Sequence, residues 1–300
     1  MDRSRSSGCE DAVTPDRNTL ADYLRARREL LQPEEVGLNR DDHRRVRGLR
    51  REEVAHLAGI SPEYYLRLEQ GRDHQPSEQV LEALAGALLL DTAGRTYLFR
   101  LARPAPAPDA PPAAPAGRRV SPGVQALLAE WSRLPAYVSD RNHDILAVTG
   151  PGALLAPGYL VPGNNLLAAV FDPAVRAHSP DDWQATASSL VASLRFHSDP
   201  RDERLHQLVG ALSVRHREFR RMWARHEARP QVSGTTLAHI DELGWISFHW
   251  QTLEVPGSCG QFVTTFFGAP GSPAAAASAY LAVRSIQNQA SVGPDAISIS

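Results

Sequence analysis

The first hundred residues carry apolar side chains at intervals of three and four positions, which is the pattern of amphipathic helices. Five such stripes follow one another: Leu20, Tyr23, Leu24, Leu30 and Leu31; Val54, Leu57 and Ala58; Tyr65 and Leu68; Val80, Leu81, Leu84 and Leu88; Tyr97, Leu98 and Leu101. They predict five short helices packed into one all-α unit.

The pattern changes in the second half of the chain, where alternating and helical segments are mixed. A helix is expected near residues 124–131. It is followed by two β-rich segments around a polar turn at 140–144, which predict a hairpin. Helical spacing then dominates the middle, strands return in "TTLAHI", "WISFHWQTLEV" and "QFVTTFFGA", and an alanine-rich helix follows from Pro273 to about Ile286. A sheet carrying an inserted helical block is the simplest arrangement, so we expect an α+β domain.

A stretch rich in proline and alanine separates the two halves. We therefore expect a multidomain chain with a helical domain at 19–102, a linker at 103–119 and a second domain at 120–287. The polar leader, residues 1–18, is expected to be disordered, and residues 288–300 to form a flexible tail.

Composition agrees with two domains and limits the chemistry. With 300 residues, 42% of them hydrophobic, each half is able to bury its own core. All 32 basic residues are arginine, which excludes lysine-based catalysis but leaves DNA binding intact, since guanidinium binds both phosphate and guanine. A net charge of −2 means that any DNA contact is local.

Two cysteines, Cys9 and Cys259, are too few for a disulfide framework or a cysteine-rich metal site. No apolar run is long enough to span a bilayer, and residues 1–18 lack the apolar core of a signal peptide. We expect a soluble, cytoplasmic protein without a membrane partner.

The second and third helical stripes are joined by the residues of a helix-turn-helix. Ala55 is the small residue of the first helix, Gly59 allows the tight turn and Ile60 supplies the apolar residue after it. Ser61 then serves as N-cap, and Pro62 takes the first helical position, where its missing N–H is harmless.

Residues 20–102 resemble the XRE (Cro/repressor-like) helix-turn-helix domains. In that family, outward residues of the second motif helix touch bases, and the matching positions are Pro62, Glu63 and Arg67. Arg67 suits bidentate recognition of guanine, and Glu63 suits acceptance of a hydrogen bond from a cytosine amine. Proline at position 62 limits that contact to an apolar one.

Five arginines fall within residues 44–51, just before the motif. One interpretation is a solvated charge run, because residues 40–72 hold eight arginines against six carboxylates. The other is a phosphate clamp, since the resemblance places phosphate contacts at the start of the first motif helix. We expect phosphate contacts from Arg44, Arg45, Arg47, Arg50, Arg51 and Tyr64, although Tyr64 also fits a plain surface aromatic. Glu69 is interpreted as a structural or ion-pair residue.

The second domain resembles the ligand-binding domain of MmyB-like transcription regulators over residues 118–286. The motifs are "LPAYVSDRNHDILA", "FDPAVRAHSPDDW", "VASLRFHSDPRDERLHQLVGALSVRHREFRRMWARHE" and "GSPAAAA". The resemblance implies a PAS-like domain with an antiparallel sheet, helices over one face, an apolar cavity and, for some members, fatty-acid-like ligands. The stretch "AVTGPGALLAPGYLVPG" departs from the family and predicts a remodelled cavity wall.

Large apolar groups are frequent in this domain, and most of them must be ordinary core. An arginine beside such groups suits a ligand carboxylate, although a surface arginine is the commoner case. The candidate ligand pocket is Trp183, Arg195, Phe196, Phe219, Trp223, His226, Phe248 and Phe266.

Catalytic patterns are not visible in the sequence. Neither His216 and His226 nor His239 and His249 have the close helical spacing of a metal site, and no glycine-rich phosphate loop or nucleophile elbow occurs. We expect no enzyme activity, no metal and no cofactor.

These observations predict a bacterial transcription regulator that binds double-stranded operator DNA, and the resemblance of the second domain implies a small apolar ligand, fatty-acid-like in kind. A homodimer is expected, because one such motif reads only a half-site. The alternative is a protein-interaction or scaffold module, in which the helical domain is structural and the second domain docks a partner.

Overall fold

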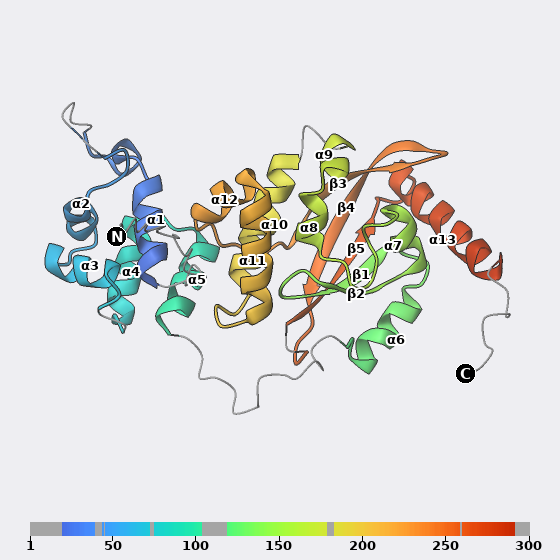
Figure 1. Ribbon diagram of the computed structural model, residues 1–300, viewed down its shortest axis with the longest axis horizontal. Coiled ribbons are helices and arrows are strands. Elements are labelled where there is room, and N and C mark those ends of the chain that lie inside the picture. The colour runs from blue at the N-terminus through green and yellow to red at the C-terminus, as the bar shows by residue number, and fades with distance from the viewer. Residues whose placement is uncertain are drawn as a thin grey trace, which may run out of the picture.

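The computed structural model describes residues 20–39, 44, 46–72, 75–103, 119–178, 183–258 and 260–291. These residues form a helical domain followed by a domain of sheet and helices, and α10, α11 and α12 lie between the helical domain and the sheet (Figure 1). The expected leader, most of the linker and the end of the tail fall outside the described residues.

The helical domain contains the five expected helices and one 3-10 turn at Pro33–Val36. The helices are α1 Leu20–Leu30, α2 Arg51–Leu57, α3 Pro62–Glu69, α4 Glu78–Ala87 and α5 Thr92–Ala102. Side-chain caps set three of their starts: Ser61 accepts from Tyr64 N–H, Ser77 from Val80 N–H and Asp91 from Gly94 N–H. Tyr23, Tyr65 and the buried leucines form a single core.

The connection between α2 and α3 has the geometry of a helix-turn-helix. Gly59 adopts a left-handed φ of +63°, which favours glycine. The N–H of Ile60 donates to the carbonyl of Ala55 at 3.0 Å, and Ala55 is fully buried. The predicted motif is therefore confirmed.

The second domain is built on one five-stranded antiparallel sheet in the order β2-β1-β5-β4-β3. Its strands are β1 Ala136–Asp140, β2 Ile145–Val148, β3 Ser233–Ile240, β4 Gly244–Glu254 and β5 Gln261–Phe267. The hairpin of β1 and β2 and the three later strands occur where the sequence pattern predicted them.

Helices surround this sheet and fill the insertion between β2 and β3. They are α6 Pro122–Glu130, α7 Gly150–Leu155, α8 Leu166–Val170, α9 Pro173–His178, α10 Trp183–His197, α11 Glu203–Arg215, α12 Arg217–Ala224 and α13 Pro273–Ser291. The helical spacing between Leu205 and Trp223 spans two helices, because His216 is extended between α11 and α12.

Three apolar cores result from this arrangement in the second domain. Helices α8, α10, α11 and α12 enclose one, α7 and α13 cover a second on one face of the sheet, and α6 packs against Val138 and Val263 on the other face. The α+β, multidomain expectation is confirmed. No helix within the described ranges is long and apolar enough to cross a membrane.

Candidate DNA-reading surface and ligand cavity

The outward face of α3 displays the three residues expected to read bases. Pro62, Glu63 and Arg67 are all exposed, whereas Tyr65 and Leu68 are fully buried. The Arg67 guanidinium lies over the Tyr64 ring, 5.3 Å from its centroid. A cation held over an aromatic face keeps its planar donors presented to solvent. The geometry suits a reading helix.

Glu69, at the end of α3, ties that helix to α1 and α2. Its carboxylate accepts from Arg28 Nε at 2.5 Å and from Arg51 Nε at 2.7 Å, and its side chain is 1% exposed. Burial raises the pKa of Glu69, but the hydrogen bonds from the two arginines outweigh burial and hold the pKa below its usual range. The predicted ion-pair role of Glu69 is confirmed.

Arg44 does not face solvent as a phosphate-binding residue would. Its guanidinium binds both oxygens of Glu53, at 2.7 and 2.5 Å, and donates to the carbonyl of Gly48 at 2.7 Å; the side chain is only 3% exposed. The pKa of Glu53 is lowered, chiefly by the hydrogen bond from Arg44. The expectation for Arg44 is corrected, because a neighbouring carboxylate takes up its donors and shields it from DNA.

The other arginines of the run have different surroundings. Arg47 is exposed, Arg50 is half-buried at the N-cap of α2, and Arg51 is half-exposed beside Glu69. Arg45 lies outside the described residues. The geometry therefore leaves Arg47, Arg50 and Arg51 as candidate phosphate contacts.

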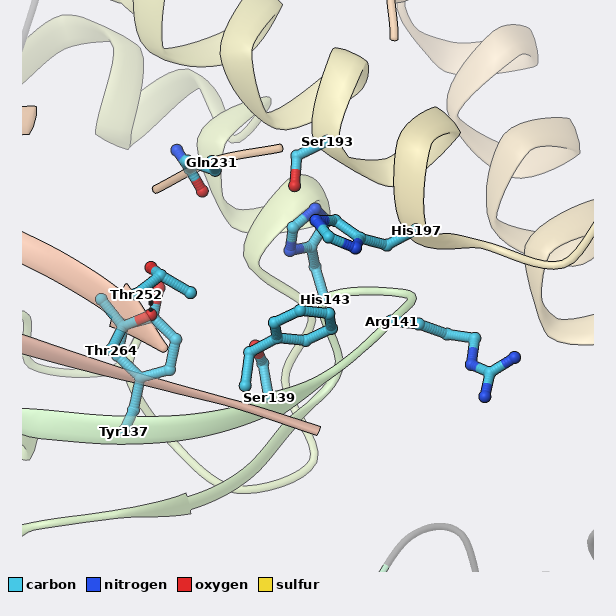
Figure 2. Close-up of a pocket in the computed structure, with 10 residues that line it drawn as sticks. Tyr137, Ser139, Arg141, His143, Ser193, His197, Gln231, Thr252 and Thr264 are labelled. Carbon is cyan, nitrogen blue, oxygen red and sulfur yellow. Dashed lines mark hydrogen bonds between the residues drawn. The ribbon is translucent and has the colours of Figure 1, made fainter. Parts of the chain in front are cut away.

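A small cavity lies between α10 and the face of the sheet that carries Tyr137 and Thr264 (Figure 2). It is lined by Tyr137, Ser139, Arg141, His143, Ser193, His197, Gln231, Thr252, Phe262 and Thr264. Its enclosed free space is about that of one water molecule. A ligand with a carbon chain fits only if α10 and the sheet move apart, since sites for such ligands occupy roughly 300–1,000 Å³.

His143 occupies an unusual position in the β1–β2 turn. It has a left-handed φ of +65° and is 8% exposed, and its Nε2 atom has no hydrogen-bond partner. Burial lowers its pKa to about 4, so the imidazole is neutral at pH 7. Left-handed backbone at a bulky residue costs energy and is found where the surroundings enforce it.

Polar contacts fix this turn against the helical block. Asp140 Oδ1 accepts from the backbone N–H groups of Asn142 and Asp144, both at 2.9 Å. Arg204 of α11 binds both oxygens of Asp144, at 2.7 and 2.6 Å, and Asn165 donates to the same carboxylate at 2.8 Å. The sequence pattern predicts the turn but not this network, because the partners lie 21 and 60 positions away from Asp144.

The eight residues expected to form one pocket are distributed over different parts of the structure. Trp183, Phe219 and Trp223 belong to the core of α8 and α10–α12, and Phe248 and Phe266 to the core under α7 and α13. None of the eight lines the cavity. That expectation is corrected: spacing identified apolar side chains but not the core that each one fills.

Arg195 and His226 also lie away from the cavity. The Arg195 side chain is fully buried, lies 3.8 Å over the Trp223 ring and donates to the Trp223 carbonyl at 2.6 Å. Its Nη1 is 3.1 Å from His226 Nδ1, and burial, followed by the Arg195 charge, lowers the pKa of His226 to about 3. Arg195 thus joins α10 to α12.

Phe196 reaches the helical domain from the same helix. It packs against that domain's core, with its ring centroid 6.3 Å from that of Tyr97, and the Arg100 guanidinium lies 4.9 Å from the Phe196 centroid. The next residue, His197, lines the cavity, and its ring centroid lies 4.5 Å from that of Phe262. Helix α10 therefore contacts both the helical domain and the cavity.

A second hollow of about 290 Å³ lies between α6 and α13, near Leu128 and Ile286. Among the described residues, its lining includes none from α10 or from the helical domain. The cavity under α10 is thus the better placed of the two to influence the helical domain.

Comparison with known proteins agrees with both halves of the structure. A model described as the MmyB-like transcription regulator ligand binding domain matches residues 120–281, and a helix-turn-helix domain model matches residues 19–98. No curated protein matches the chain. Neither of the two matched domains is an enzyme family.

Proposed function

The chain belongs to the family of MmyB-like transcription regulators and carries a DNA-binding domain ahead of its ligand-binding domain, and we propose how the two work together. In this proposal, α3 reads a specific operator sequence, two copies of the chain bind as a homodimer, and a small, largely apolar ligand controls binding. The ligand is fatty-acid-like in architecture, with an apolar chain and one polar end.

The proposed reading residues are Pro62, Glu63 and Arg67. They are exposed on one face of α3, as entry into a major groove requires. Arg67 supplies the bidentate donors for guanine, and Glu63 the acceptor for cytosine. The Tyr64 ring lies beneath the Arg67 guanidinium, and Tyr64 is the proposed aromatic contact to a DNA phosphate.

The proposed phosphate contacts come from Arg47, Arg50 and Arg51, at or before the start of α2. The ion pair of Arg51 with Glu69 links this start to the end of α3. Phosphate contacts set the register in which the reading residues meet the bases. Glu69 therefore fixes the start of α2, which carries the phosphate contacts, relative to the reading helix α3.

The observation that supports control by a ligand is that α10 contacts both the DNA-binding domain and the cavity. Phe196 packs on the core of the DNA-binding domain, and His197 lines the cavity beside it. Because the cavity is nearly filled, a ligand that enters must displace α10, the sheet, or both. A displacement of α10 shifts the surface on which the DNA-binding domain rests, so ligand occupancy and DNA affinity become coupled.

A homodimer follows from the way in which one helix-turn-helix reads DNA. A single α3 covers one half-site, and two copies related by a two-fold axis place two reading helices about one helical turn apart, roughly 34–36 Å. We propose that operators of this protein are accordingly symmetric.

Selection of binding sites from a pool of randomised duplexes by the full-length protein tests the proposal. The expected result is enrichment of an inverted repeat whose half-sites are about 10 base pairs apart, centre to centre. Recovery of unrelated sequences after repeated rounds would instead favour a protein-interaction role for the helical domain.

A further inference from the structure

The cavity under α10 is lined by polar groups, although the proposed ligand is mostly apolar. Hydroxyls, an amide and two imidazoles surround it, and no carboxylate lines it among the described residues. The hydroxyls of Thr252 and Thr264 bond to each other at 2.8 Å, as Figure 2 shows. On the same face of the sheet, the Tyr137 ring lies 6.0 Å from Phe266, where the apolar core begins. The polar cavity thus adjoins an apolar region.

His143 is the group in this cavity that most clearly lacks a partner. Its side chain is more than nine-tenths buried, and its Nε2 atom makes no hydrogen bond. The Leu190 backbone acts as a hydrogen-bond partner of the ring, and in the neutral tautomer with its proton on Nδ1 the Nε2 atom is an acceptor. An unsatisfied buried acceptor destabilises the folded state, so a donor supplied by a ligand restores a large part of that loss.

The turn that carries His143 is held in place before any ligand arrives. The Asp144–Arg204 ion pair and the Asn165 contact anchor it to the helical block, and the backbone at His143 is in the left-handed region. A residue kept in such a conformation by its surroundings is a preorganised contact. Ser193 and His197 of α10 point toward the same imidazole (Figure 2).

Cations inside this cavity are needed if its ligand carries a carboxylate, because an unpaired charge is costly to bury. His143 and His197 are both neutral at pH 7, since burial lowers their pKa values to about 4. Arg141 lines the rim, but its guanidinium extends away from the two imidazoles and packs over Gly260, where a Cβ atom would lie 2.9 Å from Arg141 Nε. The interior therefore matches a polar group without charge.

We propose that the polar end of the ligand is an uncharged hydroxyl group, as in a long-chain alcohol, bound between His143 and α10. A hydroxyl donates to His143 Nε2, and the hydroxyls of Ser193 and Thr252 offer the opposite hydrogen-bonding role. The apolar chain extends from there along the sheet face toward Phe266. This inference rests on the proposed ligand control and names the class of molecule that exerts it.

Binding of 1-decanol and of decanoate to the full-length protein tests this class. Both have a ten-carbon chain and differ in charge. Titration calorimetry at pH 7.5 is expected to give a dissociation constant for 1-decanol at least about tenfold lower than that for decanoate. The His143→Gln variant is expected to weaken 1-decanol binding by about tenfold, while the exposed control His206→Gln leaves it unchanged.

A measurement on the wild type keeps the test valid if His143→Gln fails to fold. In protein labelled with ¹⁵N-histidine, 1-decanol is expected to shift one buried imidazole while that imidazole remains neutral. Equal or tighter binding of decanoate, with conversion of a buried imidazole to imidazolium, overturns the proposal. So does the absence of any shift or binding with 1-decanol.

The duplex-selection experiment distinguishes this failure from failure of the proposed function. If the protein selects an operator and only the decanol experiments fail, the ligand class is wrong and DNA reading stands. If no operator is selected, the proposed function itself is wrong.

Discussion

The rings of Tyr97 and Phe196 lie 6.3 Å apart, so the last helix of the DNA-binding domain packs directly on α10 of the ligand-binding domain. The contact is strengthened by Arg100, whose guanidinium lies within 5.2 Å of the Tyr97 centroid and 4.9 Å of the Phe196 centroid. An aromatic pair with a cation beside it is a contact of specific geometry, which a displacement of α10 would alter.

Removal of the Phe196 ring is expected to loosen this interface. We expect Phe196→Ala to cost about 1–3 kcal/mol of interdomain stability, because the ring is half-buried and its loss leaves a gap beside Tyr97. Hydrogen exchange should accelerate in α5 and in the C-terminal half of α10. Phe267→Ala, which removes an exposed ring from β5, is the matched control. Unchanged exchange in α5 would mean that the contact does not hold the domains together.

Loss of the Glu69 charge is expected to destabilise the DNA-binding domain. Glu69→Gln leaves the buried Arg28 with only the exposed Glu29 carboxylate, at 3.3 Å, which costs about 3–5 kcal/mol. Urea denaturation measures the change, with the exposed Glu63→Gln as control. Because the folded pKa of Glu69 is lowered, its contribution is present above its ordinary value of 4.5 and is lost as the pH falls through the folded pKa. Equal stability of Glu69→Gln and Glu63→Gln would contradict the buried ion-pair role.

Substitution of Arg67 is expected to change which sequence is preferred. Arg67→Ala should lose about 1–3 kcal/mol of discrimination at one base pair in each half-site, because the bidentate donors to guanine are gone. Competition binding with single-base operator variants measures this loss. An equal loss of affinity for every operator variant would indicate that Arg67 contacts the DNA backbone and not a base.

Substitution of Arg51 is expected to act on all sequences alike. Arg51→Ala should weaken operator and random DNA by similar factors and reduce the slope of log affinity against log salt by about 1. Since Arg51 also pairs with Glu69, thermal unfolding of the variant must first show a folded domain. An unchanged salt slope in a folded variant would remove Arg51 from the phosphate contacts.

Acid pH is expected to unfold the protein partly through His226. Its pKa is about 3 in the folded state and near 6.5 when unfolded, so the unfolded chain binds the extra proton and stability falls as the pH drops from 6.5 toward 3. The slope from this group is at most about 1.4 kcal/mol per pH unit. Asp140 opposes it, because burial raises its pKa to about 6 and the folded state then binds the proton.

Variants separate these two contributions. His226→Gln should show a shallower decline in the free energy of unfolding between pH 6.5 and 4 than wild type, and the exposed His206→Gln should keep the wild-type slope. Identical slopes in all three proteins would show that the pKa of His226 does not differ between the folded and unfolded states.

Local signals made the DNA-binding motif predictable from sequence. Gly59, Ser61 and Pro62 act within one or two turns of themselves, so their types alone indicate the turn and the start of α3. Arg44 was misjudged because its partner, Glu53, lies nine positions away and on the next helix. A run of charged residues does not indicate which arginine forms an ion pair with a carboxylate.

The ligand cavity was less predictable for the same reason. The sequence shows that Trp183, Phe219 and Phe248 are large apolar residues. The core that each one enters depends on how helices and sheet are stacked. His143 was not singled out, since its left-handed backbone and its unpaired Nε2 atom exist only in the folded chain. Long-range packing therefore decides the site, whereas local pattern decides the elements around it.

The most direct test of DNA reading is a parallel titration of the full-length protein against its selected operator and a scrambled duplex of equal length at the same salt concentration. The structure predicts that the operator binds at least about 10³-fold more tightly, with most of that margin depending on the exposed face of α3. Equal affinities for the two duplexes would contradict the assignment of Pro62, Glu63 and Arg67 as reading residues.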